Sequence, residues 1–143
     1  MSVPRRQGLF VDTSAFYARF NPRDANHESA VAVFEGIRDG ELLYGPLLIS
    51  HYVLGELATL LHRHTSHDRA VEAMDSIVDS TSSFEVLSIK PETFHNAYGQ
   101  FRRFDDQKIS FVDHTSSVLA AGQDVEHVFT FDTSDFRTLR FHC

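Results

Sequence analysis

Two aspartates stand directly after short apolar runs that are typical of buried strands. Asp12 follows Gly-Leu-Phe-Val at residues 8–11, and Asp132 follows Phe-Thr-Phe at residues 129–131. In an open parallel sheet, ligands collect beyond the carboxyl ends of the strands. If both runs are parallel strands, both carboxylates lie at the same edge of the sheet. Aspartate is also a preferred helix N-cap, so capping of the helices that follow is an alternative role for both residues.

Two further acids are expected on helices. Glu56 lies between Ile49 and Tyr52 at 100° per residue, on the rim of an apolar face. There a lone carboxylate loses hydration unless an arginine, a metal or water meets it. Asp113 is three residues after Ser110, which is the spacing of a capping box, so this position taken alone favours a structural role.

Together the four acids indicate a metal site. Several carboxylates cannot all stay ionised within about 4–6 Å of one another unless a cation joins them. Ligation by carboxylate oxygen alone favours Mg²⁺ or Mn²⁺ over zinc. Such an ion positions a phosphate and activates a water, which is the chemistry of phosphodiester hydrolysis.

The elements that must hold these acids alternate between strands and helices. This order predicts a three-layer α/β/α fold with a parallel sheet of about five strands, in one domain over residues 1–143. The expected strands are residues 8–11, 41–44, 84–89, 127–131 and, as a short fifth, 139–141. The expected helices are residues 26–38, 47–64, 68–78, 91–104 and 110–121.

Composition places limits on the class of protein. The chain has 143 residues, 42% of them hydrophobic, which is ordinary for a globular protein. Its only cysteine, Cys143, excludes an internal disulfide and a cysteine-built zinc site. No apolar run reaches about 18 residues and no signal peptide is expected, so we predict a cytoplasmic protein with no membrane contact. The net charge of −7 at first disfavours a nucleic-acid partner.

Four stretches in order resemble the PIN-domain ribonucleases, particularly the VapC-type toxins of toxin–antitoxin pairs. They span nearly the whole chain and begin at Leu9, Glu56, Ser110 and Phe129. Their sequences are Leu-Phe-Val-Asp-Thr-Ser-Ala-Phe, Glu-Leu-Ala-Thr-Leu-Leu, Ser-Phe-Val-Asp-His-Thr-Ser-Ser-Val-Leu-Ala and Phe-Thr-Phe-Asp-Thr-Ser-Asp-Phe. The resemblance implies a Mg²⁺- or Mn²⁺-dependent endoribonuclease that acts on RNA, pairs with an antitoxin protein and forms a homodimer.

The resemblance also implies roles for the acids. Asp12 and Asp113 would be the principal metal ligands, and Glu56 a further ligand or the group that orients the attacking water. Asp132 would hold a second ion or a water, with Asp135 as the alternative fourth acid. The hydroxyl of Thr13 or Ser14 would hydrogen-bond a ligand carboxylate. Four of the acidic charges then belong to one metal site, so the acidity no longer argues against RNA.

Other signals favour structural roles. His62, His64 and His67 do not share a helical face, which favours a solvated turn over a zinc site. The 13 phenylalanines are expected mainly in the core. Base stacking by Phe20, Phe101 and Phe104 beside arginines is the alternative for three of them.

Three competing functions remain open. One is an RNA-processing PIN nuclease without an antitoxin, and another is a catalytically silent PIN-like binding module. A phosphoacceptor signalling domain is disfavoured, because it needs a lysine after a late strand and the only lysines are Lys90 and Lys108. The apolar segments 47–64 and 70–78 are expected to supply the protein-binding surfaces.

Overall fold

The computed structural model describes residues 6–79 and 81–143. Its centre is a parallel sheet of four strands in the order β3-β2-β1-β4. The strands are β1 (Gln7–Val11), β2 (Tyr44–Ser50), β3 (Phe84–Leu87) and β4 (His127–Phe129). Phe10 of β1 pairs with Leu48 of β2 on one side and with Val128 of β4 on the other.

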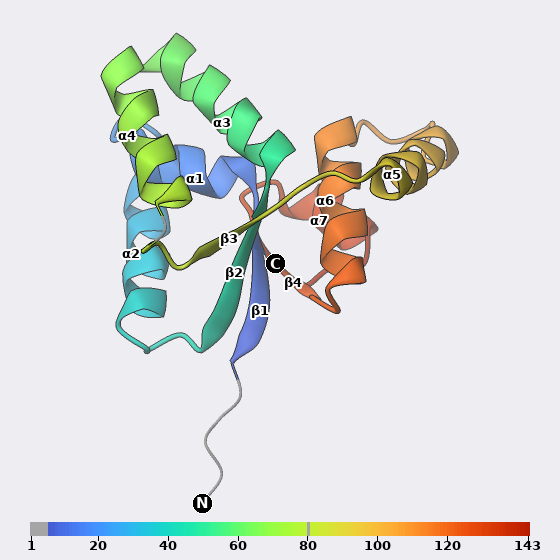
Figure 1. Ribbon diagram of the computed structural model, residues 1–143, viewed down its shortest axis with the longest axis horizontal. Helices are drawn as coiled ribbons and strands as arrows, with labels where there is room; N and C mark the ends of the chain where they lie inside the picture. Colours follow the sequence, from blue (N-terminus) through green and yellow to red (C-terminus); the bar gives the residue numbers. More distant parts are fainter. Residues whose placement is uncertain (1–5, 80) are drawn as a thin grey trace, which may run out of the picture.

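Helices cover both faces of this sheet, which confirms the predicted three-layer α/β/α fold. One layer contains α1 (Thr13–Phe20), α2 (His27–Arg38), α3 (His51–His64) and α4 (His67–Val78). The other contains α5 (Pro91–Arg103), α6 (Phe111–Gly122) and α7 (Thr133–Thr138), with α5 on the outer side of α6 (Figure 1). That residues 1–143 form one domain stays a prediction.

The core lies between the sheet and the first helical layer. Phe10, Leu48 and Ile49 are almost completely buried because the central strands are covered on both faces. Phe16 of α1 packs against Phe34 of α2, with ring centroids 5.6 Å apart. Phenylalanines from α1 and α2 therefore pack these helices against the strands. This agrees with the expectation that phenylalanines lie mainly in the core.

The predicted boundary between the second strand and the third helix is wrong. We expected a strand at residues 41–44 and a helix from Leu47, whereas β2 runs from Tyr44 to Ser50 and α3 begins at His51. A short buried apolar run has no periodicity that separates strand from helix. The register against β1 also shifts near Pro46, and such an irregularity tolerates a residue without an N–H group.

The predicted fifth strand is also wrong. In the part of the chain that the structure describes, residues 139–141 form no strand, and only an isolated bridge joins His142 to His127. Helix α7 occupies the chain up to Thr138, and Leu139 is its C-cap, so little length remains to pair with β4. The sheet therefore has four strands.

The remaining predicted elements exist, with ends displaced by one or two residues. The fourth strand stops at Phe129 rather than residue 131, and β3 stops at Leu87 rather than residue 89. Among the described residues, no helix is long and apolar enough to cross a bilayer.

Candidate active site

A cleft of about 380 Å³ opens beyond the carboxyl ends of the strands, where the acids were expected to meet. The structure brings all four predicted acids into its wall and adds Asp135. The lining residues are Asp12, Thr13, Ser14, Tyr17, Glu56, Leu60, Lys108, Ser110, Asp113, Asp132 and Asp135. They come from α1, α3, α6, α7 and adjoining segments, so the parallel sheet gathers residues that are distant in sequence.

Asp12 lies at the junction of β1 and α1, and its carboxylate does not cap the helix. It occupies the N-cap position of α1, yet its side chain makes no capping hydrogen bond. Oδ2 accepts hydrogen bonds from Thr130 Oγ1 at 2.9 Å and from Ser14 Oγ at 3.1 Å. Oδ1 is buried and has no partner among the described residues. One oxygen of Asp12 is thus held in place while the other remains available to a ligand.

The two hydroxyl donors to Asp12 are themselves oriented by the backbone. The N–H group of Phe131 donates to Ser14 Oγ at 2.9 Å, and that of Asp132 donates to Thr130 Oγ1 at 2.9 Å. Each hydroxyl accepts from the backbone and keeps its own hydrogen for Asp12. The segment after β4 is therefore coupled to the end of β1 through side-chain hydroxyls.

This network separates the two hydroxyls that the sequence could not tell apart. Ser14 makes the bond to the carboxylate, whereas the Thr13 hydroxyl is buried with no partner in the described part of the chain. Thr130 was missed, although it stands in the stretch that ends at Asp132. Its position one residue after β4 was the available signal, since that position points back to the end of the neighbouring strand β1.

The pKa of Asp12 reflects two opposed influences. Burial raises the pKa of its carboxyl group, and the nearby charge of Asp132 acts in the same direction. The hydrogen bonds from Thr130 and Ser14, together with the adjacent backbone N–H of Thr13, favour the ionised form and lower the pKa in part. The balance remains a raised pKa, so the carboxylate is short of stabilising charge.

Asp113 lies in the first turn of α6, where only half of the expected capping box forms. Its backbone N–H donates to Ser110 Oγ at 3.1 Å, so Ser110 is the N-cap as predicted. Within residues 6–79 and 81–143, the Asp113 carboxylate makes no return hydrogen bond to Ser110 and instead lines the cleft. The side chain therefore does not serve the cap.

Burial and neighbouring acids raise the pKa of Asp113 to about 8. Burial is the largest cause, followed by the charges of Asp12, Asp132, Glu56 and Asp135. The residue is only 7% exposed. A carboxyl group in these surroundings ionises near neutral pH only when a cation compensates for its charge.

The other three acids form the more open part of the cleft. Glu56 of α3 is half-buried, as expected for the rim of an apolar face. Asp132 caps α7 without a side-chain hydrogen bond, and partial burial together with Asp135 raises its pKa. Asp135 is half-buried in the first turn of α7. Both candidates for the fourth acid therefore reach the same cleft.

Positive charge is scarce around these five acids. Lys108, which sequence reasoning placed in no site, is the cation among the described residues that line the cleft. Among all the residues that the structure describes, a single salt bridge is present. It joins Arg38 to Asp39, outside the cleft. The excess of carboxylate over cation fits a hard divalent ion such as Mg²⁺ or Mn²⁺.

The acids of the cleft have the right chemistry for a divalent ion, but they do not form a complete coordination shell. No group of three or more His, Cys, Asp or Glu side chains within residues 6–79 and 81–143 is already arranged to enclose a metal ion. Mg²⁺ commonly binds through one or two carboxylates and keeps several waters. Asp12 and Asp113 are sufficient for a site with two carboxylate ligands. Oδ1 of Asp12 has no partner among the described residues, and Asp113 has a raised pKa.

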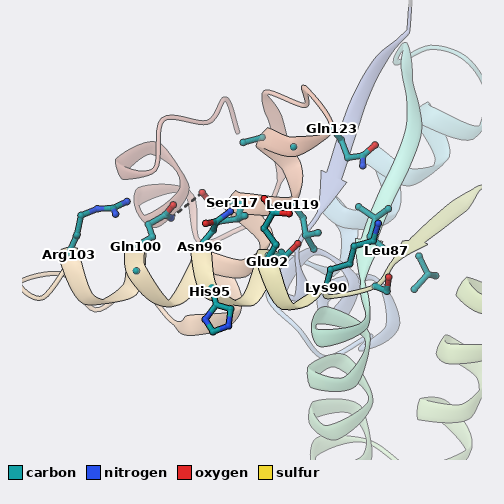
Figure 2. A pocket seen from close by; sticks show the side chains of 17 residues that line it. Leu87, Lys90, Glu92, His95, Asn96, Gln100, Arg103, Ser117, Leu119 and Gln123 are labelled. Atoms are coloured by element: carbon teal, nitrogen blue, oxygen red, sulfur yellow. Dashed lines mark hydrogen bonds between the residues drawn. The ribbon is translucent and has the colours of Figure 1, made fainter.

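A larger cavity lies elsewhere and contains none of the five acids. It measures about 920 Å³ and is bounded by the end of β3, α5 and α6. Figure 2 shows Glu92, Asn96, Gln100 and Arg103 of α5 on the side of the helix that faces Ser117 of α6. Its wall is a mixture of amides, isolated charges and apolar side chains, without a concentrated reactive group.

The three closely spaced histidines also lie outside the cleft. His62, His64 and His67 are exposed around the turn between α3 and α4. The rings of His62 and His67 meet edge to face at 5.6 Å, but they belong to no three-ligand group among the described residues. This arrangement agrees with the predicted solvated turn.

Comparison with protein families gives a match to the PIN domain over residues 9–141. The chain belongs to the PIN domain family. Two relatives from Mycobacterium tuberculosis match nearly the whole chain. The 23S rRNA-specific endonuclease VapC20 is 29% identical over 133 residues, which cover 93% of this chain and 95% of VapC20. Ribonuclease VapC26 is 23% identical over 132 residues, which cover 92% of each chain.

Solved structures of PIN proteins share this arrangement of elements. The crystal structure of VapC20, described as a sarcin–ricin loop cleaving toxin, superposes with a TM-score of 0.81 over 93% of this chain and 95% of its own. VapBC2 from Rickettsia felis, bound to a promoter DNA fragment, gives a TM-score of 0.68 at 15% identity and covers 95% and 96% of the two chains. The fold of this PIN chain therefore matches that of VapC proteins.

Proposed function

We propose that this PIN protein is a divalent-metal-dependent endoribonuclease and the toxin of a toxin–antitoxin pair. The observation that carries the proposal is the buried, unpartnered Oδ1 of Asp12 in a cleft shared with Asp113. A fixed carboxylate with a free oxygen beside an acid of raised pKa is what a metal-assisted hydrolase requires. The nuclease names of the VapC relatives give independent support.

The roles of the residues follow from their positions. Asp12 and Asp113 would hold Mg²⁺ or Mn²⁺, and the bound ion would stabilise charge on the scissile phosphate and lower the pKa of a water. Glu56, which also lines the cleft, would be a further ligand or would orient that water. Asp132 would hold further water or a second ion, with Asp135 as the alternative. Ser14 and Thr130 would keep the Asp12 carboxylate from turning.

Lys108 adds a role that the sequence did not predict. It lies in the segment before α6 and lines the cleft that otherwise presents carboxylates. A lysine there would contact a non-bridging oxygen of the RNA phosphate and reduce its repulsion from the acids. This lysine follows a helix rather than a strand, so it does not restore the phosphoacceptor interpretation.

The direct test is cleavage of RNA by the purified protein. Because VapC20 acts on 23S rRNA, structured ribosomal RNA is the first substrate to test, followed by transfer RNA and messenger RNA. We expect cleavage with Mg²⁺ or Mn²⁺, none with EDTA, and none by Asp12→Asn. Asp68→Asn, which removes an exposed carboxylate on α4, is the matched control and should cleave normally. Cleavage that persists in EDTA and in Asp12→Asn would contradict the proposal.

An antitoxin partner and a homodimer belong to the same proposal. The complexes among the structural neighbours support the antitoxin, as in VapBC2 of Rickettsia felis. The expected binding surface over residues 47–64 needs correction, because Leu47, Leu48 and Ile49 are buried in β2. The exposed part of α4 remains a candidate: Val71 and Val78 are 43% and 52% exposed, and Val71 lines an apolar groove of about 550 Å³.

Two observations would distinguish the toxin from its alternatives. Induction in a bacterial host should arrest growth for the wild type and not for Asp12→Asn. RNA cleavage without toxicity would favour an RNA-processing enzyme that needs no antitoxin, and failure to bind Mn²⁺ would favour a silent binding module. The expected cytoplasmic location stays a prediction.

A further inference from the structure

Helix α5 presents three aromatic side chains to solvent along one flank. Phe94, Tyr98 and Phe101, which we term the α5 aromatic flank, are 40%, 48% and 44% exposed. Their spacing of four and three residues places them on one side of the helix, about 10 Å from first to last. A row of exposed rings is uncommon on a surface that binds nothing.

Tyr98 of the flank is not needed to attach α5 to the rest of the protein, whereas Phe94 and Phe101 each pack one ring edge against Phe111 of α6. Ala97 is the buried residue of α5. The Gln100 amide nitrogen lies 2.9 Å from His114 Nδ1 and donates to Ser117 Oγ at 3.2 Å. These contacts join the inner side of α5 to α6, while Tyr98 points into solvent. The exposed rings therefore remain available to a ligand.

The flank is continuous with the acid cleft. Phe111, the first residue of α6, packs edge-on against Phe94 at 5.4 Å and against Phe101 at 5.8 Å. Two residues later Asp113 enters the cleft, and Lys108 lines it from the segment that joins the two helices. A chain molecule with one phosphate in the cleft would pass over Phe111 onto α5.

The charge of this region differs from that of the whole chain. The segment from Lys90 to Lys108 holds four of the 13 Lys and Arg residues but only three of the 20 Asp and Glu residues. On the flank itself, the guanidinium of Arg102 lies 5.9 Å from the centre of the Tyr98 ring. Aromatic rings interleaved with arginine and lysine suit a ligand that has flat bases and a phosphate backbone.

A second copy of the chain fits the flank less well than RNA. Three aromatic side chains at this exposure offer on the order of 250 Å². A stable dimer buries about 800 Å² on each partner. Charged residues are also depleted at the centre of such interfaces, whereas Arg102 stands over the middle ring.

We propose that the α5 aromatic flank is a stacking platform for two or three unpaired bases of the RNA whose phosphate enters the acid cleft. Bases inside a duplex cannot stack on side chains. The substrate RNA must therefore be looped or single-stranded beside the cleavage position. This inference rests on the proposed ribonuclease function and specifies the form of its substrate.

Tyr98 is the most informative position to change. It is the most exposed of the three, and it makes no ring contact with α6 among the described residues, so its replacement leaves the packing of Phe111 intact. Tyr98→Ala removes the stacking surface. Tyr98→Trp keeps it and supplies a specific fluorophore, because the chain has no tryptophan. Leu43→Ala, which shortens an apolar side chain of similar exposure in the segment before β2, is the matched control.

The test measures binding of a fluorescein-labelled, unstructured RNA of 12 nucleotides in EDTA, by fluorescence anisotropy. We expect Tyr98→Ala to weaken binding roughly fivefold or more, and Leu43→Ala and Tyr98→Trp to bind like the wild type. RNA should quench the emission of the tryptophan introduced by Tyr98→Trp, and a fully paired RNA hairpin should quench it far less. Tyr98→Ala should also raise KM for cleavage with little change in kcat.

Equal binding by Tyr98→Ala and the wild type, or unquenched tryptophan emission, would overturn the platform. Sedimentation velocity separates the protein alternative. If Tyr98→Ala dissociates a dimer while each protomer binds RNA as before, the flank is a subunit interface and the proposal is wrong. If the wild type fails to cleave RNA with either metal but binds through Tyr98, the ribonuclease function fails while the base-stacking surface stands.

Discussion

Helices α3 and α6 begin in the same way but bury different side chains. Each follows a serine N-cap whose hydroxyl accepts a hydrogen bond from the backbone N–H three residues later, and each contributes an acid to the cleft. Helix α3 buries Val53, Leu54, Leu57 and Leu61. Helix α6 buries the consecutive residues Asp113, His114, Thr115, Ser116 and Ser117, together with Ala120.

This contrast separates stability from chemistry. Burial of each leucine on α3 contributes free energy through loss of apolar surface from water. On α6, His114 Nε2 and Ser116 Oγ are buried without partners among the described residues, and burial is the main cause of the lowered pKa of His114. Unpaired buried polar groups cost stability. The buried polar groups of α6 therefore lower the free energy of unfolding, whereas the buried leucines of α3 raise it. Such a cost is expected where a site needs desolvated acids.

The largest predicted effect is on cleavage, from the α6 side of the comparison. Asp113→Asn should lower the rate of RNA cleavage about a thousandfold or more, because a neutral amide cannot replace a ligand carboxylate. The folded structure, measured by circular dichroism, should persist. If Asp113→Asn cleaves RNA at a rate within tenfold of the wild type, the Asp113 carboxylate of α6 is not needed for catalysis.

The corresponding change in α3 should affect stability instead. Leu61→Ala creates a cavity at a fully buried position and should lower the free energy of unfolding by about 2–5 kcal/mol, measured by urea denaturation. The cleavage rate per folded molecule should stay close to that of the wild type. If Leu61→Ala abolishes cleavage while the protein remains folded, the division between the two helices does not hold.

A smaller effect should arise from the hydroxyl that orients Asp12. Thr130→Val removes the 2.9 Å hydrogen bond to Asp12 Oδ2 and should lower cleavage roughly 10- to 100-fold. Thr130→Ser keeps the hydroxyl and is the matched control. Equal activity of the valine and serine variants would mean that Asp12 needs no such support.

The smallest predicted effect concerns pH and stability without metal. The folded-state pKa of Asp113, about 8, exceeds its ordinary value of 3.8. Between about pH 4 and pH 8 the folded protein therefore holds a proton that the unfolded chain releases, so its stability falls as the pH rises. In EDTA, wild-type stability should fall by about 1.4 kcal/mol per pH unit more than that of Asp113→Asn between pH 5 and pH 7. Parallel pH profiles would contradict the raised pKa.

The sequence predicted that the acids meet at one edge of the sheet, but it misplaced several boundaries of the elements. Asp12 and Asp132 follow apolar runs, and the geometry of a parallel sheet is sufficient to bring such residues to one edge. The start of α3 was misplaced because Leu47, Leu48 and Ile49 are apolar on both faces, as buried strands and buried helices both are.

Features that depend on tertiary contacts could not be read from one sequence. The hydrogen bond from Thr130 to Asp12 joins residues 118 positions apart. Lys108 reaches the cleft only because α5 and α6 fold back on each other. The exposure of Phe94 and Tyr98 follows from the outer position of α5, whereas composition favoured the core for phenylalanine (Figure 1).

We propose that Asp12 and Asp113 hold a divalent ion, and titration calorimetry with Mn²⁺ measures that binding. A ligand carboxylate must lose its proton, so wild-type affinity should rise from pH 6 to pH 8 as Asp113 ionises. Asp113→Asn should bind far more weakly at both pH values. Equal Mn²⁺ binding by the two proteins, or no binding by the wild type, would contradict the account.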